Sequence, residues 1–442
     1  MIVSFSVTNF RSIRDSFEFS LEAESSGAKP DNFFEVNLVN EKKNRLLKSA
    51  VIYGPNASGK TNFIRAVYNL TSLIKKSSNF DVEDHIPYYE PFLLDPDTEK
   101  APSKMSIDFL MYGENDIHIR YSYEIEYNRE QILMEELNYY PLGQRQNLFK
   151  RNAPSTDNES NVPASIHKAK LGKNLGYKEY DVFRNQLLLS RFGKVTPHEQ
   201  LTPVYSYFSN IEVWNALDMI RINRLKDQIA EELLAPENDH LHKRLDKLLR
   251  ISDTKINAIT VKSTDLDEVD LKDYSKSRRK SLINDIGRIS AEHNIYKDGK
   301  IVGTRELSLR EESAGTNVLF ALGGIILKRL EKGGALFFDE LDNSLHPKLS
   351  KFLVRLFNNT VSNPNNSQLV VATHEVTLLD KDVFRKDQIW FSEKDKYGVT
   401  TLFSAKDFDG VRDETPFDKW YMNGKFGGQP NIKEIEFIFG NE

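Results

Sequence analysis

Alternating apolar and polar positions open the chain. In the stretch 2–10, Val3, Phe5 and Val7 alternate with Ser4, Ser6 and Thr8, the period-two pattern of a half-buried strand. A second such run, SFEFSLEA, follows the turn-like RSIRD. Three more alternating runs, KMSIDFLMYG, IHIRYSYEIEY and ILMEELNYY, are separated by GEND and NREQ. These three runs predict antiparallel strands joined by hairpins.

Apolar residues at helical spacing appear in two other regions. Phe63 to Ile74 forms an amphipathic segment directly after a loop rich in Gly, Pro and Asn. VWNALDMIRINRLKDQIAEELL and HLHKRLDKLLRI, broken at APEND, predict a helical lobe or short hairpin, too short for a long coiled-coil arm. INAITVKS is strand-like, and Thr264–Asn284 is so densely charged that we expect a loop.

The segment Gln144–Gly176 is polar and is predicted to form a loop. Six basic residues gather in it: Arg145, Lys150, Arg151, Lys168, Lys170 and Lys173. Two interpretations stay open here, a solvated flexible loop or a contact surface.

Strand and helix patterns alternate toward the end of the chain. GALFFDE, KLSKFLVRLFNN and QLVVATHE follow one another as strand, helix and strand. This order is typical of a largely parallel, doubly wound sheet. We therefore predict an α/β fold with a mixed or parallel core sheet, an antiparallel β lobe and an inserted helical lobe.

Composition narrows the function classes. The 442 residues carry 60 Lys and Arg against 65 Asp and Glu, which argues against a basic footprint over the whole protein but leaves a local nucleic-acid contact open. The absence of cysteine excludes disulfides, zinc–thiolate sites and cysteine nucleophiles. The start MIVSFSVTNFRSI is unlike a signal peptide, and no long apolar run indicates a membrane span. We expect a cytoplasmic protein.

A phosphate-binding loop is the strongest chemical signal. GPNASGKT satisfies G-x-x-x-x-G-K-[ST], with an apolar strand before it and an amphipathic helix after it. Backbone N–H groups and the helix start would cradle phosphates, Lys60 would reach the β- and γ-phosphates, and the Thr61 hydroxyl would ligate Mg²⁺. The nucleotide-binding residues predicted here are Gly54, Pro55, Asn56, Ala57, Ser58, Gly59, Lys60, Thr61 and Asn62.

Two acidic residues end the apolar strand of GALFFDE. Asp339 is predicted to bind Mg²⁺, and Glu340 to orient or deprotonate the attacking water. Alone this pattern is common, but downstream of a phosphate-binding loop it becomes specific.

Two further segments suit the same chemistry. In LREESAGTN, Ser313 and Gly315 lie at a helix start, which can bind an anion, although Ser313 is also an ordinary helix cap. In VVATHE a strand ends near His374, which suits a contact with the γ-phosphate; a lone histidine is more often structural.

The order NFRSI, GPNASGKT, ESAGT, LFFDE, DNSLHP, ATHE resembles the ABC-type ATPase heads of the SMC/RecF/OLD kind. It is most similar to prokaryotic abortive-infection ATPases of the RloA/AriA-like group, to which ESAGT, SLHP and WYMNGKFGGQP point. The middle third of the chain carries little of this resemblance. The signature is ESAGT rather than LSGGQ, and no Q-loop glutamine is assignable from spacing.

The resemblance implies a division of the chain and further roles. Residues 1–140 and 256–442 would form the two parts of the ATPase head, with 141–255 as the inserted, mainly helical lobe. Asn9, Phe10 and Arg11 would lie near the base and phosphates, or form a plain strand-end turn. Ser313, Gly315 and Thr316 would contact ATP held by a second subunit.

In the same family pattern Glu340 would be the catalytic base and His374 the switch histidine. The loop Asn343–His346 would lie across a dimer interface. ATP and Mg²⁺ would thus join two chains in a homodimer, with a higher homo-oligomer left open.

Three functions compete at this point. The first is an ATP-driven sensor of antiphage defence that controls a separate, nuclease-like effector, since the chain shows no nuclease constellation of its own. The second is a DNA-repair or chromosome-maintenance ATPase of the RecF/SMC kind. The third, the energy module of a transporter, would need a membrane partner.

Overall fold

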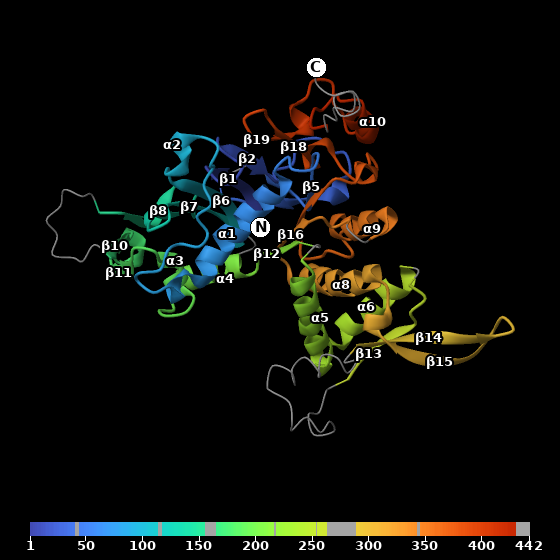
Figure 1. Ribbon diagram of the computed structural model, residues 1–442. Helices are drawn as coiled ribbons and strands as arrows, with labels where there is room; N and C mark the ends of the chain where they lie inside the picture. Colours follow the sequence, from blue (N-terminus) through green and yellow to red (C-terminus); the bar gives the residue numbers. More distant parts are fainter. Residues whose placement is uncertain are drawn as a thin grey trace, which may run out of the picture. The chain divides into compact units, whose positions relative to one another are not determined.

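The computed structural model describes residues 1–39, 44–113, 117–154, 165–215, 218–252, 254–262, 289–342 and 345–429 (Figure 1). The chain divides into two compact units. Unit 1 comprises Met1–Trp214, Gly333–Glu340 and Val354–Glu442, and unit 2 comprises Asn215–Lys332 and Leu341–Leu353.

An eight-stranded antiparallel sheet occupies one side of unit 1. Its strand order is β11-β10-β9-β8-β7-β6-β1-β2. The strands are β1 (Ile2–Thr8), β2 (Phe17–Ser20), β6 (Ser103–Tyr112), β7 (His118–Tyr127), β8 (Ile132–Tyr140), β9 (Gln146–Asn152), β10 (Ile166–Leu171) and β11 (Glu179–Phe183). The hairpins predicted between residues 105 and 140 are confirmed, since β6 pairs with β7 and β7 with β8.

The loop predicted for Gln144–Gly176 is wrong at Gln146–Asn152 and Ile166–Leu171, which form β9 and β10. Basic residues on or beside these strands have acidic partners in the sheet: Arg145 and Lys150 pair with Glu136, and Lys168 and Lys170 pair with Glu179. Four of the six basic residues that suggested a solvated loop therefore form ion pairs with acidic residues of the neighbouring strands.

A six-stranded mixed sheet forms the other layer, in the order β12-β16-β17-β5-β18-β19. Its strands are β5 (Ser49–Tyr53), β12 (Glu212–Asn215), β16 (Ala335–Asp339), β17 (Gln368–Thr373), β18 (Ile389–Lys394) and β19 (Thr400–Ser404). The four strands from β16 to β18 run parallel, and β19 closes the edge antiparallel. The predicted parallel core sheet is confirmed, and β5 lies inside it.

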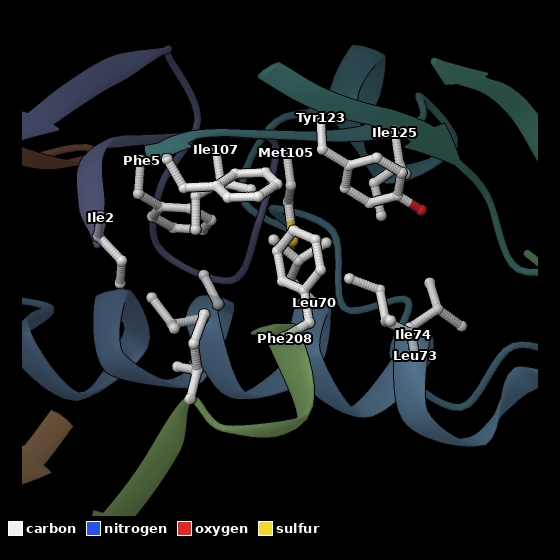
Figure 2. Close-up of a cluster of buried hydrophobic side chains, with 14 of the residues drawn as sticks. Ile2, Phe5, Leu70, Leu73, Ile74, Met105, Ile107, Tyr123, Ile125 and Phe208 are labelled. Atoms are coloured by element: carbon white, nitrogen blue, oxygen red, sulfur yellow. The ribbon is translucent and has the colours of Figure 1, made fainter. Parts of the chain in front are cut away.

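Helix α1 (Lys60–Lys76) packs between the two sheets. Its apolar positions Phe63, Ile64, Val67, Leu70 and Ile74 are all buried, as helical spacing predicted. Figure 2 shows one side of this core, where Leu70, Leu73 and Ile74 of the helix face side chains from β1, β6 and β7. On the other side α1 contacts β16 and β17. The helix that follows the phosphate-binding loop is thus fixed on both faces.

The remaining described elements of unit 1 are shorter. They are β3 (Phe33–Val36), β4 (Asn44–Leu47), α2 (Pro96–Glu99), α3 (Leu188–Phe192), α4 (Leu201–Ser209) and α10 (Phe417–Met422); α9 (Pro347–Asn358) begins in unit 2 and ends in unit 1.

Unit 2 is built on α8 (Ala314–Lys332), which packs against α5 (Met219–Leu233) and α6 (Asp239–Ile251). Two glycines allow this close approach. A Cβ atom on Gly323 would lie 2.5 Å from a methyl of Leu248, and one on Gly324 would lie 2.8 Å from Ile229. The strands β13 (Ala258–Val261), β14 (Ile289–Lys297) and β15 (Lys300–Ser308) form a separate antiparallel sheet.

The predicted helical hairpin is confirmed in unit 2, but its first helix begins at Met219, because Val213–Asn215 belong to β12. The loop expected at Thr264–Asn284 lies outside the described residues. The two compact units have other boundaries than the domain limits predicted at 140 and 255, and β9–β11 belong to the sheet of unit 1. The predicted domain limits remain a prediction. The α/β class, with a separate antiparallel sheet and a helical lobe, is confirmed.

A buried polar network lies under the antiparallel sheet. Glu135 accepts hydrogen bonds from the N–H groups of Leu188 and Leu189 at 2.7 and 3.0 Å, and Arg151 donates to Nδ1 of His167 at 3.1 Å. Because a guanidinium only donates, His167 is neutral with its proton on Nε2. Burial, followed by the charges of Arg151 and Arg184, lowers the pKa of His167 to about 4.

This histidine predicts acid sensitivity. The folded pKa lies below the ordinary value of 6.5, so the unfolded chain binds the extra proton and stability is lost as the pH falls from 6.5 toward 4. Between pH 7 and pH 5, the protonation of His167 lowers the free energy of unfolding by about 2 kcal/mol. Chemical unfolding at both pH values should show a smaller loss for His167→Gln than for the wild type. The exposed His85→Gln serves as control, and an equal loss in all three proteins would contradict the prediction.

Candidate functional site

Residues Gly54–Gly59 form a tight loop after β5, and Lys60 and Thr61 begin α1. Ala57 and Gly59 have φ values of 64° and 111°, so the loop passes twice through the left-handed region. A Cβ atom on Gly54 would lie 2.4 Å from the carbonyl oxygen of Ser392, and one on Gly59 would lie 2.2 Å from Oγ1 of Thr400. Both glycines are therefore required by close neighbours, and Gly59 also by its backbone conformation.

Lys60 is the buried cation of this loop. Its side chain is 5% exposed, and Nζ donates to the carbonyl oxygens of Gly54 and Pro55 at 2.8 and 3.0 Å. The ammonium group thus bridges back over the loop from the first turn of α1. Thr61 follows it and is exposed.

The loop fits a phosphate group. Among the described residues, the backbone N–H groups of Ala57 and Gly59 make no hydrogen bond, and Gly59 begins α1 without a side-chain cap. A helix start with free N–H groups and a lysine is a binding site for anions. The chemistry of this donor set matches the phosphates of a nucleotide.

Sheet register brings the acidic residues to the same edge. Asp339 is opposite Ala372 of β17, and Thr373 is opposite Tyr53 of β5, so the ends of the three strands lie in neighbouring rows. Because β17 separates β16 from β5, the acidic pair lies two strands from the loop. Asp339 is 2% exposed, and this placement suits a metal ligand between the loop and β16.

Glu340 has an unusual backbone. Its φ is 62°, although it is neither Gly, Asn nor Asp, while its N–H still bonds to the carbonyl of Ala372 at 2.9 Å. Such left-handed residues cost about 1–2 kcal/mol and gather at active sites. The turn brings one carboxylate oxygen to 3.3 Å from Nδ1 of His374, which is half exposed at the end of β17. The two residues predicted separately from sequence therefore form a pair.

The three residues predicted to lie near the nucleotide in the N-terminal turn have different environments. Asn9 is buried, and its amide donates to carbonyls of the segment 98–102 and accepts from the N–H of Phe92. Phe10 is also fully buried. These contacts favour the plain strand-end turn for both residues. Arg11 is partly exposed and pairs with Glu90.

Glu90 joins this turn to α1. It accepts hydrogen bonds from Nε of Arg65 at 2.9 Å and from the amide of Asn69 at 3.1 Å. Burial alone would raise the pKa of Glu90, but the hydrogen bonds from Asn69 and Arg65 and the charges of Arg65 and Arg11 outweigh it, so the pKa is lowered. Arg11 is thus held beside the helix that carries Lys60.

The ESAGT segment lies in unit 2, at the start of α8. Oγ of Ser313 accepts from the N–H of Thr316 at 3.1 Å, so Ser313 is the helix cap that the sequence left as one alternative. The amide of Asn317 donates to three carbonyls of residues 309–313, which fixes the loop before the helix. Ser313 is exposed and Gly315 is partly exposed.

The loop predicted to lie across a dimer interface is described only in part. Asn343 and Ser344 lie outside the described residues. His346 is exposed before α9, and its Nδ1 accepts from the N–H of Lys348 at 3.2 Å.

Sequence reasoning missed Ser392 and Thr400, which bond to the phosphate-binding loop, and Ser12, which bonds to Thr400. Two of them donate hydrogen bonds to the carbonyl of Ser58. Asn62, predicted to bind nucleotide, instead donates to Oγ of Ser12 at 2.6 Å. Small hydroxyl residues have no recognisable spacing, and the pairing of β18 with β5 could have pointed only to Ser392.

A family model described as "AAA domain, putative AbiEii toxin, Type IV TA system" matches residues 49–380, a range that includes Lys60, Asp339, Glu340 and His374. Among solved structures, the chain is similar to a crystal structure of the SmcHead bound to the C-winged helix domain of ScpA. The identity is 13%, the TM-score is 0.43, and the match covers 91% of this chain and 97% of that chain. No protein in a search of curated proteins matches this chain. Across the described ranges, no helix is both long and apolar enough to cross a membrane.

Proposed function

Since this chain belongs to the family of AAA domains that its residues 49–380 match, we propose that it binds and hydrolyses ATP as the sensor of an antiphage defence system. The observation that carries the ATPase assignment is the arrangement at one sheet edge. The phosphate-binding loop follows β5, the Glu340–His374 pair ends β16 and β17, and the three strands are neighbours in one sheet.

We assign residues of this site to phosphate binding, to metal binding and to activation of water. Lys60 and the N–H groups of Ala57 and Gly59 bind the phosphates, and Thr61 with Asp339 would hold Mg²⁺. When bound, this ion neutralises charge on the β- and γ-phosphates. Glu340 accepts a proton from the attacking water, and His374 holds the Glu340 carboxylate in place.

The proposed site is completed by a second copy of the chain. Ser313, Gly315 and Thr316 contact the γ-phosphate bound by the partner, so that ATP joins two chains. What supports this step is the exposure of Ser313 beside a capped helix start, where an anion is favoured.

The defence role is supported by the words "putative AbiEii toxin, Type IV TA system" in the family's description. In this role the ATPase controls a separate nuclease-like effector. ATP-dependent association is then the signal that the effector reads.

Two measurements test the role. Cells carrying the chain with its genomic neighbours should form fewer phage plaques than cells carrying the Lys60→Ala chain. The purified protein should hydrolyse ATP at a rate that double-stranded DNA leaves unchanged. Stimulation by DNA severalfold, without any protection from phage, would instead support a DNA-repair ATPase.

A further inference from the structure

A row of consecutive hydrogen bonds, from Asn62 through Ser12 and Thr400 to Ser58, supports the phosphate-binding loop. The amide of Asn62 donates to Oγ of Ser12 at 2.6 Å, and Oγ of Ser12 lies 2.7 Å from Oγ1 of Thr400. Oγ1 of Thr400 in turn donates to the carbonyl of Ser58 at 2.8 Å. Ser12, Ser58 and Thr400 are all at least nine-tenths buried, so water does not compete for these bonds.

Proton counting fixes the direction of this row. The Thr400 hydroxyl has one proton, and the Ser58 carbonyl can only accept it. Thr400 therefore accepts from Ser12, and Ser12 accepts from Asn62. The row runs one way, from the first turn of α1 through the N-terminal turn and β19 to the loop.

The last hydrogen bond of the row fixes the orientation of the peptide between Ser58 and Gly59. A trans peptide is planar, with its C=O and N–H pointing in opposite directions. Thr400, together with Oγ of Ser392 at 3.0 Å, holds the Ser58 carbonyl toward β18 and β19. The N–H of Gly59 therefore points away from these strands, and it has no partner among the described residues.

We propose that Thr400 is a positioning residue of the nucleotide site, which orients the Gly59 N–H toward the phosphates through the Ser58 carbonyl and is itself oriented by Ser12. This inference rests on the proposed ATP binding and adds to it a role for a residue 340 positions beyond Lys60. An N–H of the loop contacts phosphates that ADP and ATP share. Thr400 should therefore affect both nucleotides equally.

The test compares Thr400→Val, which keeps the shape and loses the hydroxyl, with Thr400→Ser, which keeps the hydroxyl. Calorimetric titration with ADP and with a non-hydrolysable ATP analogue, both with Mg²⁺, should show about tenfold weaker binding of each nucleotide to Thr400→Val. Thr400→Ser should stay within about threefold of the wild type. The neighbouring Thr401→Val, on an exposed position of β19, controls for the change of residue type.

A double-mutant cycle tests the row as a unit. Ser12→Ala should weaken ADP binding by about threefold, and adding it to Thr400→Val should cost little more, because the second change breaks a row that is already broken. A merely structural role predicts additive losses that follow the melting temperature.

The outcomes separate the two proposals. Native ADP affinity of Thr400→Val at an unchanged melting temperature overturns the positioning role alone. If Thr400→Val does not fold, a Thr400→Ser protein that folds but binds ADP about tenfold or more weakly than the wild type overturns it as well. A wild-type chain that binds no nucleotide overturns both proposals.

Discussion

Lys60→Ala should abolish nucleotide binding, with at least about 100-fold weaker affinity for both ADP and ATP. Lys60 is expected to make charge-assisted hydrogen bonds to phosphate, and each such bond contributes about 1.5–3 kcal/mol. The loss has a second source in this chain. Nζ also bridges to the carbonyls of Gly54 and Pro55, so its removal frees the loop to change shape.

Calorimetric titration measures both affinities directly. Lys76→Ala removes the same charge from the exposed end of the same helix and should bind nucleotide normally. Binding by Lys60→Ala at near-native affinity would refute the phosphate-binding assignment of the loop. Loss in both variants would indicate a long-range effect of charge, which salt would remove.

Glu340→Gln should bind ATP normally but hydrolyse it about 100- to 10,000-fold more slowly, the range for loss of a general base. The amide keeps the size of the side chain and its contact distance to His374, but it does not accept a proton. With hydrolysis blocked, the proposed two-chain complex should accumulate. Phosphate release measures the rate, and light scattering measures the mass with ATP and with ADP.

Gly315→Arg in the Glu340→Gln background isolates the contact between chains. It adds bulk at the start of α8 but leaves the Ser313 cap intact, which Ser313→Arg would also remove. The double variant should bind ATP as a single chain. Normal hydrolysis by Glu340→Gln would exclude Glu340 as the base, and unchanged ATP-dependent association of the double variant would contradict the ESAGT assignment.

Strict local patterns made much of this molecule predictable. The phosphate-binding loop follows from eight consecutive residues, and period-two alternation located β6, β7 and β8. The apolar run before Asp339 gave β16. Each of these signals lies within one element, where the sequence alone defines the environment of a side chain.

The predictions were wrong where the role of a residue depends on its tertiary contacts. Lys168 and Lys170 suggested a loop because the sequence does not reveal that both form ion pairs with Glu179 of the neighbouring strand β11. Asn9 looked free to bind a ligand, but segment 98–102 uses its amide. Thr400 and Ser12 carried no signal, because their partners lie hundreds of residues apart along the chain.

The position of β5 has a consequence for how this chain is made. Both neighbours of β5 in the sheet, β17 and β18, come from residues 368–394, more than 300 positions later. During synthesis on the ribosome, the partners of the apolar strand Ser49–Tyr53 in the sheet therefore become available only after most of the chain has emerged. The nucleotide site is complete only when β19 has been added. A chain interrupted before β17 would leave this apolar strand without either neighbour and would lack the Thr400 bond to the phosphate-binding loop.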